Sequence, residues 1–169
     1  MKNPDHGPVL VGITGDQPDA VGARAVEFAK AFSTEIVFVW VDTTQYTSGF
    51  MSDGTVAFAT FDPELGLEGK SEAPWLDERA AAITAESGVG WRTRVGAGQP
   101  AAVLAAIAEE EDARFIVVGT REPGFIAGLQ EFLGGSVAAH LAHTQARPVI
   151  LVPLRPVGKN ERVPWDPEA

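Results

Sequence analysis

Five short apolar runs alternate along the chain with segments of helical periodicity. The runs are VLVGI (9–13), EIVFVWV (35–41), GWRTRV (90–95), RFIVVG (114–119) and RPVILVP (147–153). Runs of this length that are rich in β-branched residues are typical of buried strands. The third run is half polar, so we expect it at an edge of the sheet.

Between these runs the apolar positions recur with the period of a helix. We expect the first helix to be capped by Asp16 or Asp19 and to run to about Phe32. A second helix is predicted over 75–87, with Gly88 as its stop. A third helix is predicted after Gly98-Gln99, with Pro100 at its first helical position. A fourth helix is predicted over 136–144.

This alternation of strands and helices predicts an α/β domain with a parallel sheet covered on both faces. The crossovers are expected to be right-handed, and five strands make a small doubly wound domain. Ligands of such folds bind at the carboxyl ends of the strands, where the strand order reverses. The candidate loops are therefore Thr14–Asp16, Val41–Thr44, Ala97–Gln99 and Thr120–Gly135.

One segment interrupts the pattern. Residues 43–74 are rich in Gly, Thr, Ser and Asp and show no sustained period. A stretch this long is often a lid, a binding loop or a partner contact, and it is equally explained as a tolerated surface insertion. We interpret 1–153 as one domain that carries this insertion, and 154–169 as a polar C-terminal tail.

Composition and charge narrow the function classes. The 169-residue chain contains no cysteine, which excludes disulfides and thiolate metal sites. The net charge of −10 argues against binding to nucleic acids and to anionic membranes. The N-terminal apolar run is too short for a signal peptide or a membrane span, so we expect a cytoplasmic protein. Backbone N–H groups could still form a local anion site.

Three stretches resemble the universal stress protein family. They are VLVGITGD, VGAGQPAAVLAAIAEEEDARFIVVGT and GGSVAAHLAHTQARPVILVP, and together they span about residues 8–153 apart from the insertion. The resemblance implies a three-layer, Rossmann-like fold of the adenine-nucleotide alpha hydrolase-like type, with strand order 3-2-1-4-5. It also implies a stress-response role and a homodimer that forms through the last strand, 147–153.

The glycine-rich loop departs from the pattern of the nucleotide-binding members. Those members carry Gly, two residues, Gly, nine residues, then Gly-Ser or Gly-Thr. Here Gly119 fits the first position and Gly135-Ser136 the last pair, whereas Glu122 stands at the second glycine. The nearest glycine is Gly124, and the loop is three residues longer. Thr14 replaces the Asp that usually ends the first strand.

Two hypotheses remain open on this basis. In the first, the protein binds ATP or AMP, with Mg²⁺, at the carboxyl ends of the strands. The residues assigned to this ligand are Gly119, Thr120, Gly124, Gly135, Ser136 and Val137 around the phosphates, and Ile13, Thr14 and Val39 around the base and ribose. In the second, the loop is empty and the protein is a scaffold that acts through dimerisation and protein partners.

Other chemistries are less well supported. The segment around Ser136 resembles a nucleophile elbow, but it lacks the strand that must directly precede the serine. His140 and His143 lie one helical turn apart, yet no third ligand is near in sequence to complete a metal site. We therefore expect no catalytic or metal residues, and no enzymatic activity beyond slow ATP hydrolysis.

Overall fold

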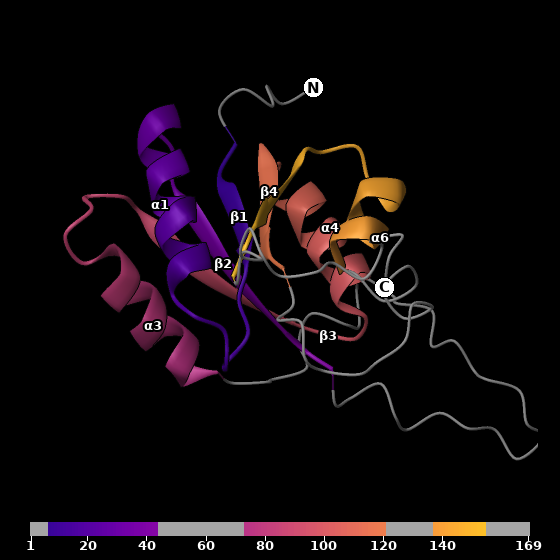
Figure 1. Cartoon of the computed structure of the whole chain (residues 1–169), viewed down its shortest axis with the longest axis horizontal. Coiled ribbons are helices and arrows are strands. Elements are labelled where there is room, and N and C mark those ends of the chain that lie inside the picture. The colour runs from indigo at the N-terminus through magenta and orange to yellow at the C-terminus, as the bar shows by residue number, and fades with distance from the viewer. Residues whose placement is uncertain (1–6, 44–72, 121–136, 155–169) are drawn as a thin grey trace, which may run out of the picture.

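A five-stranded parallel sheet forms the centre of the protein (Figure 1). The computed structural model describes residues 7–43, 73–120 and 137–154. Its strands are β1 (Val9–Gly12), β2 (Ile36–Asp42), β3 (Trp91–Ala97), β4 (Phe115–Gly119) and β5 (Val149–Val152). Its helices are α1 (Ala20–Phe32), α3 (Pro74–Thr84), α4 (Pro100–Glu110) and α6 (Val137–Thr144). The strand order β3-β2-β1-β4-β5 confirms the predicted fold class and topology.

Each face of the sheet carries its own hydrophobic core. Figure 1 shows α1 and α3 on one side of the strands and α4 and α6 on the other. Along β2, Ile36 and Phe38 point into the first core, and Val37 and Val39 into the second. Because side chains alternate along a strand, burial on both faces explains why the central strands are continuous apolar runs.

The two edge strands differ in character. Along β3, Arg92 and Arg94 face α4 and form ion pairs, Arg92 with Glu35 and Glu111, and Arg94 with Glu110 and Glu111. Charged side chains on an edge strand oppose pairing with another chain. The other edge strand, β5, exposes 51% of Leu151. Both edge positions agree with the sequence prediction.

The ion pairs along β3 set the protonation of their carboxylate. Partial burial raises the pKa of Glu111, but hydrogen bonds and charge from Arg92 and Arg94 outweigh it. The pKa of Glu111 therefore lies below its ordinary value. Burial likewise lowers the pKa of Arg92, and its bonds to Glu35 and Glu111 outweigh that effect, so its pKa is raised. Both groups are charged at neutral pH.

Two helix starts show where the sequence prediction was accurate and where it was not. Pro100 opens α4 after the N-cap Gln99, as predicted. Asp19 occupies the N-cap position of α1, but its side chain makes no capping hydrogen bond. The carboxylate of Asp19 instead accepts a hydrogen bond from Arg79 of α3. A tertiary contact has therefore replaced the local cap that we expected.

Candidate functional site at the carboxyl ends of the strands

The strand order reverses between β1 and β4, and this point marks the candidate site. From β1 the chain passes to α1 on one face of the sheet, and β4 is followed in the described chain by α6 on the other. Crossovers that diverge in this way leave a crevice at the carboxyl ends of the two strands. On the side of β1 that faces β2, the last hydrogen bond of the ladder runs from Ile13 N–H to Val39 O, at 2.8 Å. Beyond this bond the β1–α1 loop, residues 13–19, leaves the β1–β2 ladder and leads into α1.

A tight turn forms the first half of this loop. The backbone N–H of Gln17 donates to Thr14 O at 3.2 Å. In return, the Gln17 side chain accepts the N–H of Thr14 through Oε1, at 3.1 Å. The Thr14 hydroxyl donates to Asp16 Oδ1 at 2.9 Å. Thr14 is exposed, so its hydroxyl is accessible to a ligand that offers a better partner.

The Gln17 side chain also reaches the end of β4. A Cβ placed on Gly119 would lie 2.5 Å from Gln17 Nε2, 2.9 Å from Val21 Cγ2 and 3.1 Å from Leu154 Cδ1. Contacts under 3.0 Å are repulsive, so no residue with a side chain fits here without a shift. The packing around the end of β4 thus accounts for the glycine at 119, whether or not the residue also approaches a phosphate.

Arg79 fixes the same loop from the outside. Its Nε donates to Asp19 Oδ1 at 2.8 Å. Its Nη1 donates to Thr14 O at 2.8 Å and to Gly15 O at 3.4 Å, and its Nη2 donates to Gln17 O. The Arg79 side chain is only 16% exposed. One guanidinium of α3 therefore holds three backbone carbonyls of the β1–α1 loop.

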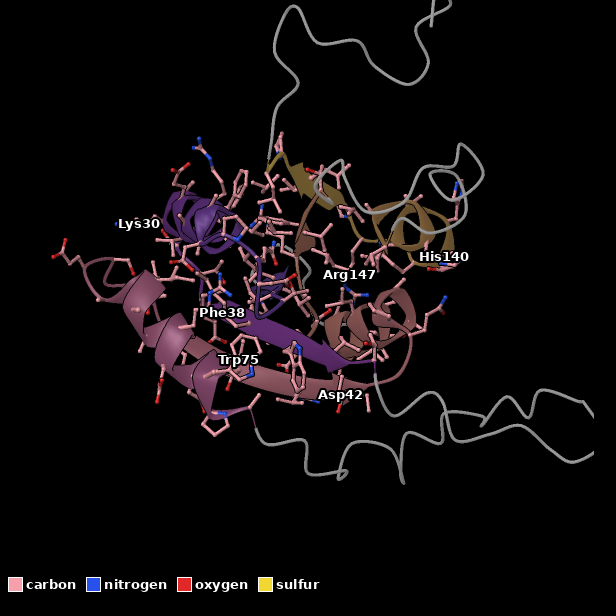
Figure 2. The ribbon with its side chains drawn as sticks, turned by 60° about the horizontal axis from the view of Figure 1, so that its bottom comes forward. Lys30, Phe38, Asp42, Trp75, His140 and Arg147 are labelled. Carbon is pink, nitrogen blue, oxygen red and sulfur yellow. The ribbon has the colours of Figure 1, made fainter. Side chains whose placement is uncertain are left out.

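The neighbouring strands end in a second group of polar residues. Asp42, at the end of β2, is 9% exposed, and its backbone carbonyl accepts the N–H of Gly98 at 2.9 Å (Figure 2). Gly98 has a φ of +124°, which favours glycine and lets the chain turn from β3 into α4. Gln99 Nε2 lies 3.4 Å from Nδ1 of His140 on α6. This contact links the first turns of α4 and α6.

The residues predicted to surround a nucleotide lie in different environments. Ile13 and Val39 are 2% and 1% exposed, in the cores on opposite faces, so only their backbones reach the edge. Thr120 is directed to β5: its N–H donates to Val152 O, and its hydroxyl accepts the N–H of Leu154.

The other predicted residues belong to the loop that leads into α6. Val137, half-buried, begins α6 and packs on the second core. Gly124, Gly135 and Ser136 lie outside the described residues, as do Glu122, the insertion from 44 to 72 and the tail from 155. The assignment of Gly124, Gly135 and Ser136 to the phosphates therefore remains a prediction.

Three residues at this edge were missed by the sequence analysis. Asp42 ends β2 and lies in the candidate loop Val41–Thr44, but no role was assigned to the residue itself. Gln17 directly follows the candidate loop Thr14–Asp16, but nothing in the sequence showed that it would contact Gly119. Arg79 gave no signal, because its partners lie 60 to 65 residues earlier in the chain.

Helix dipoles favour an anion at this edge. In a parallel α/β fold each helix returns from the carboxyl end of a strand, so its N-terminus and free N–H groups face that edge. Here α1, α4 and α6 begin at Ala20, Pro100 and Val137. Within residues 7–43, 73–120 and 137–154, no three His, Asp or Glu side chains are grouped to hold a metal ion. None of the helices described there combines the length and apolar character needed to cross a lipid bilayer.

Solved structures with the same fold include proteins bound to adenine nucleotides. A universal stress protein in complex with cAMP is 22% identical, covers 89% of this chain and 98% of its own, and has a TM-score of 0.58. The Archaeoglobus fulgidus universal stress protein in complex with dAMP is 22% identical, with coverage of 86% and 97% and a TM-score of 0.53. An Arabidopsis thaliana universal stress protein family protein with AMP bound is 15% identical, with coverage of 88% and 92% and a TM-score of 0.55.

At identities of 15–22%, the similarity to these solved structures shows the fold alone, so the family is judged from the sequence. No curated protein matches the sequence. The profile of the universal stress protein family matches residues 6–153, which is nearly the whole chain and includes all the strands described above. The resemblance seen in the sequence motifs is thereby confirmed. The chain belongs to the universal stress protein family.

Proposed function

We propose that the protein binds an adenine nucleotide, ATP or AMP, at the carboxyl ends of β1 and β4, as part of a cytoplasmic stress response. One observation carries the proposal. The exposed turn of the β1–α1 loop meets the end of β4 at the point where the strand order reverses, with Gln17 in contact with both Thr14 and Gly119. Structures of the same fold are described as complexes with cAMP, dAMP and AMP, which supports the choice of ligand.

The edge offers separate groups for the two ends of a nucleotide. Thr14 presents an exposed hydroxyl, and the Gln17 carboxamide can both donate and accept, as hydroxyls of a ribose or nitrogens of a base require. The N-termini of α1, α4 and α6 favour the negative phosphates. Gly124, Gly135, Ser136 and Val137 are the residues we assign to those phosphates. With ATP, Mg²⁺ would enter with the triphosphate rather than through a protein site.

Isothermal titration calorimetry with ATP and with AMP, each with and without Mg²⁺, tests this proposal. We expect saturable heat with at least one adenine nucleotide and none with GTP. Gly135→Val should abolish the heat, because its side chain would block the backbone approach to phosphate. Absence of heat and of any thermal shift at millimolar ATP and AMP would rule out the proposal. Any ATP hydrolysis by the saturated protein should be slow.

The second candidate is a scaffold that binds no nucleotide and acts through dimerisation and protein partners. Its support is the position of β5 at the edge of the described sheet, where it pairs with β4 on one side only and Leu151 is half exposed. Dimerisation through 147–153 is compatible with either candidate. Light scattering after size exclusion should give twice the 17.9 kDa mass of the chain. Only the titration with nucleotide separates the two candidates.

A further inference from the structure

The contact between Arg79 and the β1–α1 loop joins two parts of the fold that are distant in sequence. Of its four hydrogen bonds, three end on the backbone carbonyls of Thr14, Gly15 and Gln17, and one on the carboxylate of Asp19. Arg79 is largely buried, whereas Thr14, Gly15 and Asp19 are exposed. The anchor is therefore better shielded from solvent than the loop that it holds.

These four hydrogen bonds also argue against direct phosphate binding by Arg79. A guanidinium has five N–H donors in one plane, and the loop receives four hydrogen bonds from them. Little capacity is left to bind a phosphate directly. Lysine could not replace it, because an ammonium on a flexible stem cannot address several carbonyls in one plane.

The position of Arg79 is itself fixed by the other contacts of α3. Trp75, in the first turn, packs edge-on against Trp40 of β2 with ring centroids 5.7 Å apart. Asp77 accepts a hydrogen bond from the hydroxyl of Thr93 on β3 at 2.5 Å. Leu76 is 1% exposed in the core. Figure 2 shows Trp75 on the side of the sheet where α3 lies. A rigid helix therefore presents the guanidinium to the loop.

We propose that Arg79 is the positioning residue of the nucleotide site, which sets the β1–α1 loop in its binding conformation without touching the ligand. This inference rests on the function proposed above. Because one guanidinium holds three of its carbonyls, the backbone from Thr14 to Gln17 is confined to one conformation. That conformation orients the Thr14 hydroxyl and the Gln17 carboxamide. A preorganised loop loses less conformational freedom when a ligand binds.

The experiment compares Arg79→Ala with Arg24→Ala. Arg24 is a matched control, since it is an exposed arginine on α1 that pairs only with its helical neighbour Glu27 among the contacts described. Calorimetry with ATP or AMP gives the affinity, and ¹⁵N relaxation gives the backbone order parameters of Thr14 to Gln17. We expect Arg79→Ala to bind about tenfold more weakly, which corresponds to about 1.4 kcal/mol. Its loop order parameters should fall from about 0.85 to below about 0.6. Arg24→Ala should match the wild type in both.

A rescue arm separates positioning from a general loss of structure. Millimolar guanidinium, far below denaturing concentrations, should restore part of the affinity of Arg79→Ala and leave Arg79→Lys and the wild type unchanged. Equal affinity of Arg79→Ala and wild type, or an unchanged loop, would overturn the inference. If the wild type itself binds no nucleotide, the proposed function fails, while the order parameters still decide whether Arg79 holds the loop.

Discussion

Substitution of Gly119 by alanine tests whether packing, rather than a ligand, requires glycine at the end of β4. The added Cβ would lie 2.5 Å from Gln17 Nε2 and 2.9 Å from Val21 Cγ2. The Gln17 amide can move, since it ends a flexible side chain, but Val21 is fully buried on α1 and cannot. The substitution therefore forces a shift of α1 or of the end of β4.

The magnitude follows from two opposing effects. Overpacking of a dense core costs about 1–3 kcal/mol. Gly119 has no positive φ, so alanine also restricts the unfolded chain and returns about 0.4–1 kcal/mol. The free energy of unfolding should fall by about 1–2 kcal/mol. For a domain of this size that lowers Tm by roughly 2–8 °C.

Gly15→Ala is the matched control. Gly15 lies in the same loop region, has no positive φ, and its Cβ would meet nothing within 4 Å. It should therefore keep or slightly raise Tm, through the same effect on the unfolded chain. Thermal denaturation of both variants, in protein freed of nucleotide, isolates the steric cost.

Equal Tm values for Gly119→Ala and Gly15→Ala would refute a steric requirement for glycine at 119. Such a result would mean that the neighbours of Gly119 yield freely, and that packing does not account for the glycine. In that case nucleotide affinity should be measured for both variants. A loss of affinity in Gly119→Ala without a loss of stability would mean that the ligand alone requires glycine at 119.

Three further predictions concern other parts of the fold. The folded pKa of Glu111 lies below its ordinary value of 4.5, so its contribution to stability is present above about that pH and is lost as the pH falls through the folded pKa. The difference in Tm between wild type and Glu111→Gln should accordingly shrink between pH 5 and 3, and a constant difference would contradict this. If the protein dimerises through β5 as proposed, Leu151→Lys should give a monomer in light scattering with little change in Tm, because the side chain is half exposed. In urea unfolding, Gly98→Ala, at φ +124°, should lower the free energy of unfolding by about 1–3 kcal/mol. Gly88→Ala, at φ +69°, should lower it by about 1 kcal/mol, and a larger loss for Gly88→Ala than for Gly98→Ala would contradict this.

The course of the chain was predictable because each element carries a local signal. The run EIVFVWV predicted β2 to within a residue, since both faces of a central parallel strand must be apolar. Gly98-Gln99-Pro100 predicted the start of α4, since proline fixes φ at the first helical position. The half-polar β3 was correctly placed at an edge, because its arginines required solvent or acidic partners.

The candidate site was only partly predictable. Thr14 and Gly119 were singled out because one closely follows a buried strand and the other ends one, and strand ends can be read from the sequence. Asp16 or Asp19 was expected to cap α1. Asp19 takes the N-cap position, but its carboxylate accepts a hydrogen bond from Arg79, and no local rule reports a competing partner from another helix. Gln17 directly follows the predicted turn Thr14–Asp16, and its contact with Gly119 became visible only in the folded chain.

The sequence by itself determined the alternation of elements, the parallel sheet and the edge at which a ligand would bind. These properties depend on periodicity, on strand composition and on motifs, all of which act over a few residues. The tertiary structure alone decided how the β1–α1 loop is held and why residue 119 is a glycine. Both depend on contacts of Arg79 and Gln17 with residues far along the chain, and side-chain geometry across such distances is fixed by packing rather than by local preference.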